Sequence, residues 1–350
     1  MLLDPLPDPF GERAATFTPK TMGLLGGRIE FNSNSRELLA LVDAAYRGLP
    51  RHVLPGGVGK MKITLRVSPA RPGCRPARPE SRSKVPRGRL SRSVPPPLVM
   101  LQGAGLLGGA TECSNFVVIS PHEQSALVVI SPDMLRFPYH TRYELIEFAV
   151  YTLAARAQGL VPLHAACVGR RGRGILLMGP SGAGKSTLAL HCLLAGFHFL
   201  SEDSVFVAPE SLLATGIANF LHVRSDSLRW LGETEEAGAI RRSPIIRRRS
   251  GVKKFEVDLR RKPFRLAPSP MQIAGIVFLS PRRGRAGQLL KPLVKSQLLG
   301  KMLSMQGYGA NQPQWPLFSK NVSRLDAFEL RRGRHPAEGI DALRSLLNEL

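Results

Sequence analysis

The amino-acid sequence predicts an α/β fold that is built around a glycine-rich loop and is preceded by an N-terminal α+β region. The first observation is the segment GPSGAGKST at Gly179–Thr187, which lies between a strand-like and a helix-like segment. The second is the alternation of strand-like and helical segments around it. The third is the length of 350 residues, which corresponds to about two domains at roughly 150 residues per domain. We therefore expect an N-terminal region at 1–140 and a second domain at 141–350.

The composition indicates a globular protein with a strong excess of positive charge. Hydrophobic residues make up 43% of the chain, and 49 Lys and Arg residues face 26 Asp and Glu residues, for a formal net charge of +23. Much of this charge falls in the segments 66–92 and 241–265, and neither contains Tyr or Trp. Because single strands are usually bound by stacking of bases on aromatic rings, a nucleic-acid partner is disfavoured. Solvated basic loops are the first interpretation, and a polyanion or an acidic protein partner is the alternative.

The sequence indicates neither a membrane span nor an export signal. It has no run of about 18 apolar residues, and its start, MLLDPLPDPF, lacks the basic and apolar segments of a signal peptide. The four cysteines show no CxxC spacing, which argues against a structural zinc site; they are Cys74, Cys113, Cys167 and Cys192. These features predict a cytoplasmic protein with free thiols.

The region before residue 141 is predicted to contain strands and one long loop. MKITLRV at Met61–Val67 alternates as a strand does. Residues 68–97 are rich in Pro, Arg, Ser and Gly with almost no apolar residues to bury, which predicts a disordered basic linker. FVVIS at Phe116–Ser120 and ALVVIS at Ala126–Ser131 are joined by PHEQS and predict a β-hairpin.

A helix and a hairpin are expected to lead into the glycine-rich segment. Thr141 and Glu144 have the spacing of a capping box at the start of a helix. VPLHAACVG and GILLMG follow on either side of RRGR at Arg170–Arg173, as two buried strands. Symmetric pairing about this turn matches position 168 with 174, which places His164 beside Met178. Farther along the chain, GIVFLS predicts a strand at 275–280, and 336–350 predicts an amphipathic helix.

The glycine-rich segment matches the phosphate-loop (Walker A) pattern G-x-x-x-x-G-K-[ST]. Its glycines allow backbone N–H groups to approach phosphate oxygens, and the N-terminus of the following helix adds partial positive charge. Lys185 is expected to reach the β- and γ-phosphates, and Ser186 to ligate Mg²⁺. The predicted nucleotide-binding residues are Gly179, Pro180, Ser181, Gly182, Ala183, Gly184, Lys185, Ser186 and Thr187.

Two further features concern the chemistry beside this loop. His164 can hydrogen-bond a phosphate or orient an acid, and a buried histidine satisfied by backbone groups is an equal alternative. Glu202 and Asp203 follow the apolar residues of the next predicted strand, within FHFLSEDSVFVA at Phe197–Ala208. Carboxylates at the carboxyl end of a strand in an α/β sheet face the ligand crevice, where they can bind Mg²⁺ or accept a proton. The alternative is an ordinary turn between two strands.

The stretch HAACVGRRGRGILLMGPSGAGKSTLALHCLLAGFHFLSEDSVFV resembles the core of the HPr kinase/phosphorylase family. His164, Lys185 and Asp203 stand 21 and 18 residues apart, in the order and with the spacing of that family. The resemblance covers about residues 160–208 and implies a phosphoenolpyruvate-carboxykinase-like P-loop fold. It also implies that His164 and Lys185 assist at the phosphates, that Asp203 acts as a base toward a hydroxyl, and that Ser186 binds Mg²⁺.

The residues and the resemblance together predict an ATP-dependent kinase or phosphotransferase that uses ATP and Mg²⁺, with Glu202 as a further Mg²⁺ ligand. The family has two aspartates where this chain has Glu202 and Asp203, and Leu221–Glu233 occupies the region of the family's downstream glycine-rich signature. An ATP-binding regulatory or scaffold protein without fast transfer is therefore the main alternative. A nucleic-acid-binding NTPase is the third. The phosphate acceptor, either a protein serine or a small-molecule hydroxyl, stays open, as does assembly into a homo-oligomer.

Overall fold

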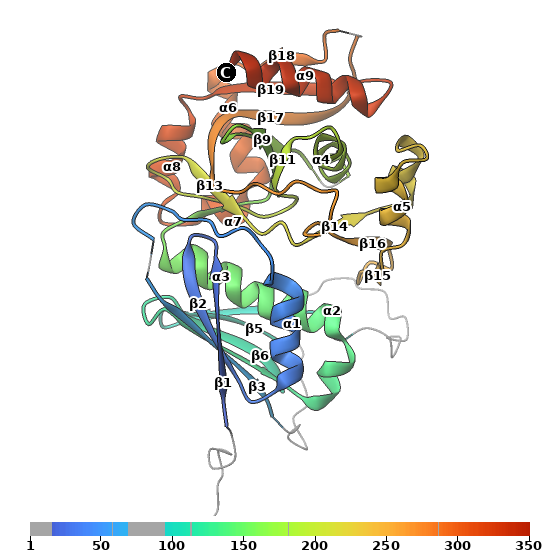
Figure 1. Cartoon of the computed structure of the whole chain (residues 1–350). Helices are drawn as coiled ribbons and strands as arrows, with labels where there is room; N and C mark the ends of the chain where they lie inside the picture. Colours follow the sequence, from blue (N-terminus) through green and yellow to red (C-terminus); the bar gives the residue numbers. More distant parts are fainter. Residues whose placement is uncertain (1–15, 58, 69–94, 113, 181, 286) are drawn as a thin grey trace, which may run out of the picture. The chain divides into compact units, whose positions relative to one another are not determined.

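The computed structural model describes residues 16–57, 59–68, 95–112, 114–180, 182–285 and 287–350 (Figure 1). Most of the expected linker at 68–97 lies outside these residues, as do Cys74, Cys113 and Ser181. The chain divides into two structural units. The first comprises 1–22, 28–47 and 60–153, and the second comprises 23–27, 48–59 and 154–350. This division falls within one helix, whereas the sequence suggested a boundary before that helix, at 140.

The first unit is organised around a seven-stranded sheet in the order β1-β2-β3-β7-β6-β5-β4. β3 runs parallel to both β2 and β7, and the pairs β7–β6, β6–β5 and β5–β4 are antiparallel. The predicted strand at 61–67 and the predicted hairpin are confirmed as β3 and as β6 with β7. In chain order the strands are β1 (Thr18–Leu24), β2 (Gly27–Ser33), β3 (Met61–Val67), β4 (Val99–Gly103), β5 (Leu106–Glu112), β6 (Asn115–Ser120) and β7 (Ser125–Ile130).

A helix of the first unit, α1 (Arg36–Tyr46), packs against this sheet. It begins where the Ser35 side chain accepts a hydrogen bond from the backbone N–H of Leu38, as an N-cap serine does. Alternate residues of β2 are buried, among them Phe31, whose ring stacks on that of Tyr46 with centroids 6.1 Å apart. The period-2 pattern of the strand and the apolar side of the helix therefore meet in one core.

The helix predicted to start at Thr141 in fact starts earlier, so the predicted capping box is wrong. After the 3₁₀ turn η1 (Pro132–Arg136), α2 (Pro138–His140) runs on into a π-helical segment (Thr141–Ile146) and then α3 (Glu147–Ala157). Proline favours the first turn of a helix, which moves the start to Pro138. The Thr141 hydroxyl donates to the Met134 carbonyl oxygen at 2.9 Å, and Glu144 pairs with His140 instead of capping.

The second unit contains a nine-stranded sheet whose main path is β11-β9-β10-β17-β13-β12-β8. β10 and β19 run parallel to the long strand β17, and β18 pairs with β19 at this edge. The strands are β8 (Val161–Leu163), β9 (Ala166–Arg170), β10 (Arg173–Met178), β11 (His198–Ser201), β12 (Val205–Val207), β13 (Leu213–Gly216), β17 (Met271–Arg283), β18 (Leu290–Pro292) and β19 (Asp326–Arg332).

Helices cover both faces of this sheet, which confirms the predicted α/β class. Ile175 and Leu177 of β10 belong to the core that includes α4 (Lys185–Leu194) and α9 (Pro336–Glu349), the latter being the predicted C-terminal helix. Leu176 and Met178 belong to the opposite core, with α6 (Lys295–Met305) and α8 (Trp315–Val322). Since successive side chains of a strand point to opposite faces, β10 contributes to both cores and is buried on both sides.

A small sheet of three strands completes the second unit, in the order β14-β16-β15. These strands are β14 (Phe220–Val223), β15 (Ile245–Arg247) and β16 (Lys253–Asp258). A 3₁₀ turn, η3 (Ser225–Trp230), and α5 (Glu235–Arg241) connect β14 to β15, and α7 (Gly307–Ala310) follows α6.

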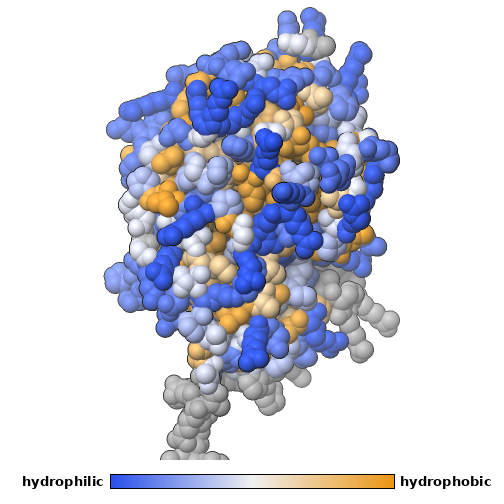
Figure 2. Space-filling view, in the orientation of Figure 1, coloured by the Kyte–Doolittle hydropathy of each residue, from blue (hydrophilic) through white to orange (hydrophobic). Residues whose placement is uncertain are grey.

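Hydrophilic residues predominate on the face of the molecule shown in Figure 2, with hydrophobic residues in patches between them. None of the helices in the described residues is long and apolar enough to cross a membrane.

Candidate functional site

The glycine-rich loop connects the end of β10 to the start of α4. Gly182 and Gly184 have φ angles of +81° and +102°, which L side chains rarely adopt, so glycine is required at both positions. Within the described part of the loop, the N–H of Ala183 donates to the Pro180 carbonyl oxygen at 3.1 Å. No described side chain caps α4, whose N-cap is Gly184. The first N–H groups of α4 therefore point out of the helix toward any anion that the loop encloses.

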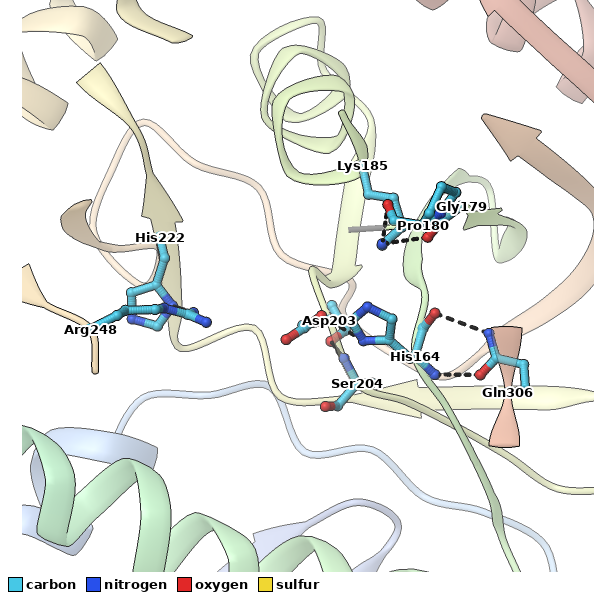
Figure 3. Close-up of polar contacts among 10 residues, drawn as sticks. His164, Gly179, Pro180, Lys185, Asp203, Ser204, His222, Arg248 and Gln306 are labelled. Carbon is cyan, nitrogen blue, oxygen red and sulfur yellow. Dashed lines mark hydrogen bonds and ion pairs between the residues drawn. The ribbon is translucent and has the colours of Figure 1, made fainter. Parts of the chain in front are cut away.

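Lys185, the first residue of α4, folds back over the loop. Its Nζ donates to the Gly179 carbonyl oxygen at 2.7 Å and lies 3.5 Å from that of Pro180 (Figure 3). The side chain is only 7% exposed. Burial lowers the pKa of Lys185, and the charges of Asp203 and Glu202 oppose that shift without cancelling it. The ammonium group therefore makes hydrogen bonds to neutral carbonyl oxygens and lies near two carboxylates. From this position its side chain can move to hydrogen-bond a phosphate oxygen instead.

Asp203 and His164 form a direct pair. The Nδ1–H of His164 donates to Oδ1 of Asp203 at 2.8 Å, and both side chains are about half exposed (Figure 3). Burial works to raise the pKa of Asp203, but the hydrogen bond from His164 and the positive charges of His164, Arg248 and Lys185 outweigh it. The pKa of Asp203 therefore lies below its ordinary value, and the carboxylate is ionised at neutral pH.

His164 is not positioned by the strand pairing that the sequence predicted. The hairpin turn consists of only Arg171 and Gly172, with φ of +51° and +77°, so Arg170 pairs with Arg173. The register is shifted by one residue from the predicted one, and the paired positions end at Ala166 and Leu177. The predicted pairing of His164 with Met178 is therefore wrong. His164 instead lies between β8 and β9, where the chain leaves the sheet.

Gln306 holds the backbone of His164 from both sides. Its Oε1 accepts from the His164 N–H at 2.7 Å, and its Nε2 donates to the His164 carbonyl oxygen at 3.1 Å (Figure 3). Gln306 is 2% exposed and lies between α6 and α7, 142 residues away in sequence. The sequence gives no local signal for the role of this residue, because a lone glutamine matches no motif.

Glu202 faces a different partner from its neighbour Asp203. Its Oε2 accepts a hydrogen bond from the backbone N–H of His222 at 3.0 Å, which ties the turn after β11 to β14. The ring of His222 in turn lies between Glu256, 3.2 Å from Nε2, and Arg248, which donates to Nδ1 at 3.1 Å. Glu202 is thereby fixed in place, and its other carboxylate oxygen can still accept a further ligand.

Lys185, His164, Asp203 and Glu202 line one cavity of about 520 Å³. The predicted residues that line it are His164, Gly182, Gly184, Lys185, Ser186, Thr187, Glu202 and Asp203. Basic residues that were not predicted as site residues lie in the same wall, namely Arg224, Arg229, Arg248 and Lys254. Two of them, Arg248 and Lys254, come from the basic segment 241–265, for which the first interpretation was a solvated loop. Burial and the charge of Arg248 lower the pKa of Lys254, while Glu202 and Asp203 oppose this shift.

Gly179, Pro180 and Ala183 are predicted residues that do not line this cavity. Gly179 and Pro180 supply the carbonyl partners of Lys185, and the Thr187 hydroxyl lies 3.2 Å from that of Ser227. Ala183 lies on the other side of the loop. No group of three or more His, Cys, Asp or Glu side chains in the described residues is arranged to hold a metal ion. Cys167 and Cys192 are buried free thiols, and burial raises the pKa of each to about 12.

Comparison with family models and with curated proteins finds no match to this chain. Among solved structures, the chain is similar to the Hpr(Ser) kinase/phosphatase from Coxiella burnetii. The two share 14% sequence identity over 54% of this chain and 88% of that chain, with a TM-score of 0.26.

Proposed function

We propose that this chain is an ATP-dependent kinase or phosphotransferase with a phosphoenolpyruvate-carboxykinase-like P-loop fold. One observation carries the proposal: the loop lysine, Lys185, and the His164–Asp203 pair line the same cavity, although they come from three separate segments of the chain. A cation that neutralises phosphate charge and a carboxylate that orients a nucleophile are the two groups that phosphoryl transfer needs side by side.

The glycine-rich loop and the N-terminus of α4 would bind the nucleotide phosphates. Their backbone N–H groups supply donors, and Lys185 would leave the carbonyl oxygen of Gly179 for the more negative phosphate oxygens. Mg²⁺, when bound with ATP, neutralises charge on the transferred phosphoryl group. Ser186 and Glu202 line the cavity and fit this ion, since Mg²⁺ in such sites takes one or two protein oxygens and completes its shell with phosphates and water.

Asp203 would accept the proton of the attacking hydroxyl. Its Oδ1 is occupied by the Nδ1–H of His164, which leaves Oδ2 to orient the hydroxyl. As the hydroxyl oxygen bonds to the γ-phosphorus, the bond from that phosphorus to the bridging oxygen breaks, ADP leaves, and the proton passes to Asp203. The low pKa of Asp203 keeps it ionised for this role. Arg224, Arg248 and Lys254 give the cavity a basic wall, which favours an acceptor that carries negative charge.

The test measures binding and transfer on the same preparations. Mg-ATP binding is followed by calorimetry for the full chain and for Lys185→Ala. Transfer of radiolabelled γ-phosphate is followed toward a panel of free and peptide hydroxyl acceptors, half of them anionic. Binding that depends on Lys185, with transfer to at least one acceptor, is the expected result. Binding without transfer would favour the ATP-binding scaffold, and absence of binding would overturn the proposal.

A further inference from the structure

One wall of the cavity of about 520 Å³ is formed by the small three-stranded sheet and its connecting loops. His222 comes from β14, Arg248 from the loop between β15 and β16, and Lys254 from β16. A second cavity, of about 300 Å³, lies on the other side of the glycine-rich loop, and neither His164 nor Asp203 lines it. A phosphate acceptor that meets Asp203 therefore occupies the larger cavity, next to this wall.

Two cations of this wall, Lys254 and Arg248, interact with each other. Burial and then the charge of Arg248 lower the pKa of Lys254, and Glu202 and Asp203 oppose the shift. Lys254 forms no ion pair with any of the described residues. The guanidinium group of Arg248 donates to Nδ1 of His222 at 3.1 Å, which holds it against the wall. Two like charges in a partly buried position cost free energy, and an anion bound between them would offset that cost.

Lys254 and Lys185 belong to different parts of this cavity. Each interacts with the charges of Asp203 and Glu202, but within the described residues neither lysine alters the pKa of the other. Figure 3 shows Lys185 folded over the glycine-rich loop, and it shows Arg248 away from that loop, on another side of Asp203. The phosphates of a nucleotide on the loop would engage Lys185, which leaves Lys254 and Arg248 for a different anion.

We propose that Lys254 and Arg248 bind a carboxylate or phosphate group that the phosphate acceptor carries close to its reacting hydroxyl. The inference rests on the proposed function and adds the acceptor class, an anionic hydroxyl compound. Lysine supplies a mobile point charge and arginine a planar set of donors, and both suit these anions. Because Lys254 interacts with Asp203, and charge interactions are largely screened beyond about 10 Å, the anionic group lies within about that distance of the hydroxyl. A small hydroxy acid or phosphate ester carries such a group, as does a peptide with an acidic residue beside its serine.

Calorimetry tests the anion site while the loop is saturated with Mg-AMP-PNP, an ATP analogue that does not transfer its phosphate. Glycerol, D-glycerate and glycerol 3-phosphate all carry a hydroxyl and differ in the anionic group. We expect the two anions to bind the full chain at least about tenfold more tightly than glycerol. Lys254→Gln should weaken their binding by about tenfold, the size expected for one lost hydrogen bond to a charged group. The matched control is Lys253→Gln, since Lys253 is exposed, does not line the cavity and should not affect binding.

Transfer from Mg-ATP identifies the source of the anion. Preference for D-glycerate or glycerol 3-phosphate over glycerol indicates a small molecule, and preference for a blocked peptide with aspartate beside its serine over the same peptide with asparagine indicates a peptide.

Three results would overturn the inference and leave the proposed function standing, provided that nucleotide binding still depends on Lys185. The anions bind no better than glycerol, transfer ignores the charge in both comparisons, or Lys254→Gln weakens Mg-AMP-PNP binding as much as anion binding. If the wild-type chain does not bind Mg-AMP-PNP at all, both proposals are wrong.

Discussion

The two cavities that border the glycine-rich loop are both basic, but only the larger one also contains carboxylates among its described lining residues. The larger one is lined by three carboxylates, two histidines and several cations, whereas the smaller one has no described carboxylate and is lined by Trp230, His335, four arginines and aliphatic side chains. Both cavities are lined by Gly182 and Gly184 of the loop, which have no side chain. The contrast indicates that the residues facing the loop from outside it decide the chemistry of each cavity.

The contrast extends to how the side chains are held. In the larger cavity, charged groups are positioned through hydrogen bonds from distant segments, such as the pair that Gln306 makes to the backbone of His164. In the smaller cavity, the rings are positioned by local structure, since Trp230 ends the η3 turn and His335 caps α9. Substitutions among the charged groups of the larger cavity should therefore affect transfer more than nucleotide affinity.

Lys185→Ala is expected to have the largest effect on both transfer and nucleotide binding, because Lys185 would contact the nucleotide phosphates directly. Transfer should fall by about 10²–10³-fold, in the range for removal of a group that stabilises charge in the transition state. Binding of both Mg-ATP and Mg-tripolyphosphate should weaken as well. Rapid-quench transfer assays and calorimetry measure the two effects, and circular dichroism checks the fold. Wild-type affinity in this variant would contradict a phosphate role for the loop.

Asp203→Asn is expected to distinguish most clearly between the rate of phosphoryl transfer and the affinity for Mg-ATP. It removes the charge but keeps the size, so single-turnover transfer should fall by about 10²-fold or more, the typical contribution of a general base. Affinity for Mg-ATP should change little, because the loop and Lys185 remain. The matched control is Glu202→Gln, which keeps an oxygen to accept from the His222 N–H. It should retain most of the transfer rate at saturating Mg²⁺ and need more Mg²⁺ to reach it.

Gln306→Ala tests whether a residue outside the cavity positions His164. Loss of both hydrogen bonds should let the His164 backbone move. We expect kcat to fall by about tenfold, which corresponds to an increase of about 1.4 kcal/mol in the activation free energy. The affinity for Mg-ATP should be unchanged. Gln306→Glu keeps the acceptor for the His164 N–H and should recover part of the rate. If Gln306→Ala and Gln306→Glu both fold and lose the same factor in kcat, the hydrogen bond from the His164 N–H does not position His164.

The smallest expected effect is a shift in pH dependence. The hydrogen bond and charge of His164 lower the pKa of Asp203, so Asp203 should lose activity as a base only when pH falls below the ordinary range for an aspartate. His164→Gln removes the charge and should raise the pKa of Asp203, which moves the acid limb of the rate profile to higher pH. The profile of kcat over pH 3–8 measures the shift. An unmoved acid limb would mean that another group sets it.

Much of the local structure was predictable because it depends on residues close in sequence. Alternation identified β3 and the hairpin of β6 and β7, and the C-terminal apolar pattern identified α9. The glycine-rich loop was also recognisable, since its glycines, its lysine and the flanking strand and helix are contiguous. The predictions that failed also concern local geometry, at the start of the helix near Thr141 and in the register of the hairpin at Arg171 and Gly172. In both places a turn or cap had a competing alternative one to three residues away.

Only the tertiary structure decided which distant residues surround the loop. Gln306 meets His164, Arg248 meets His222, and His335 meets Trp230 across separations that no local pattern encodes. The physical reason is that such contacts follow from how helices and strands pack on the nine-stranded sheet, and this depends on complementary surfaces and not on sequence spacing. The sequence by itself determined the element that can hold phosphates. The packing around that element determined that Asp203, Glu202 and His164 lie together on one side of it.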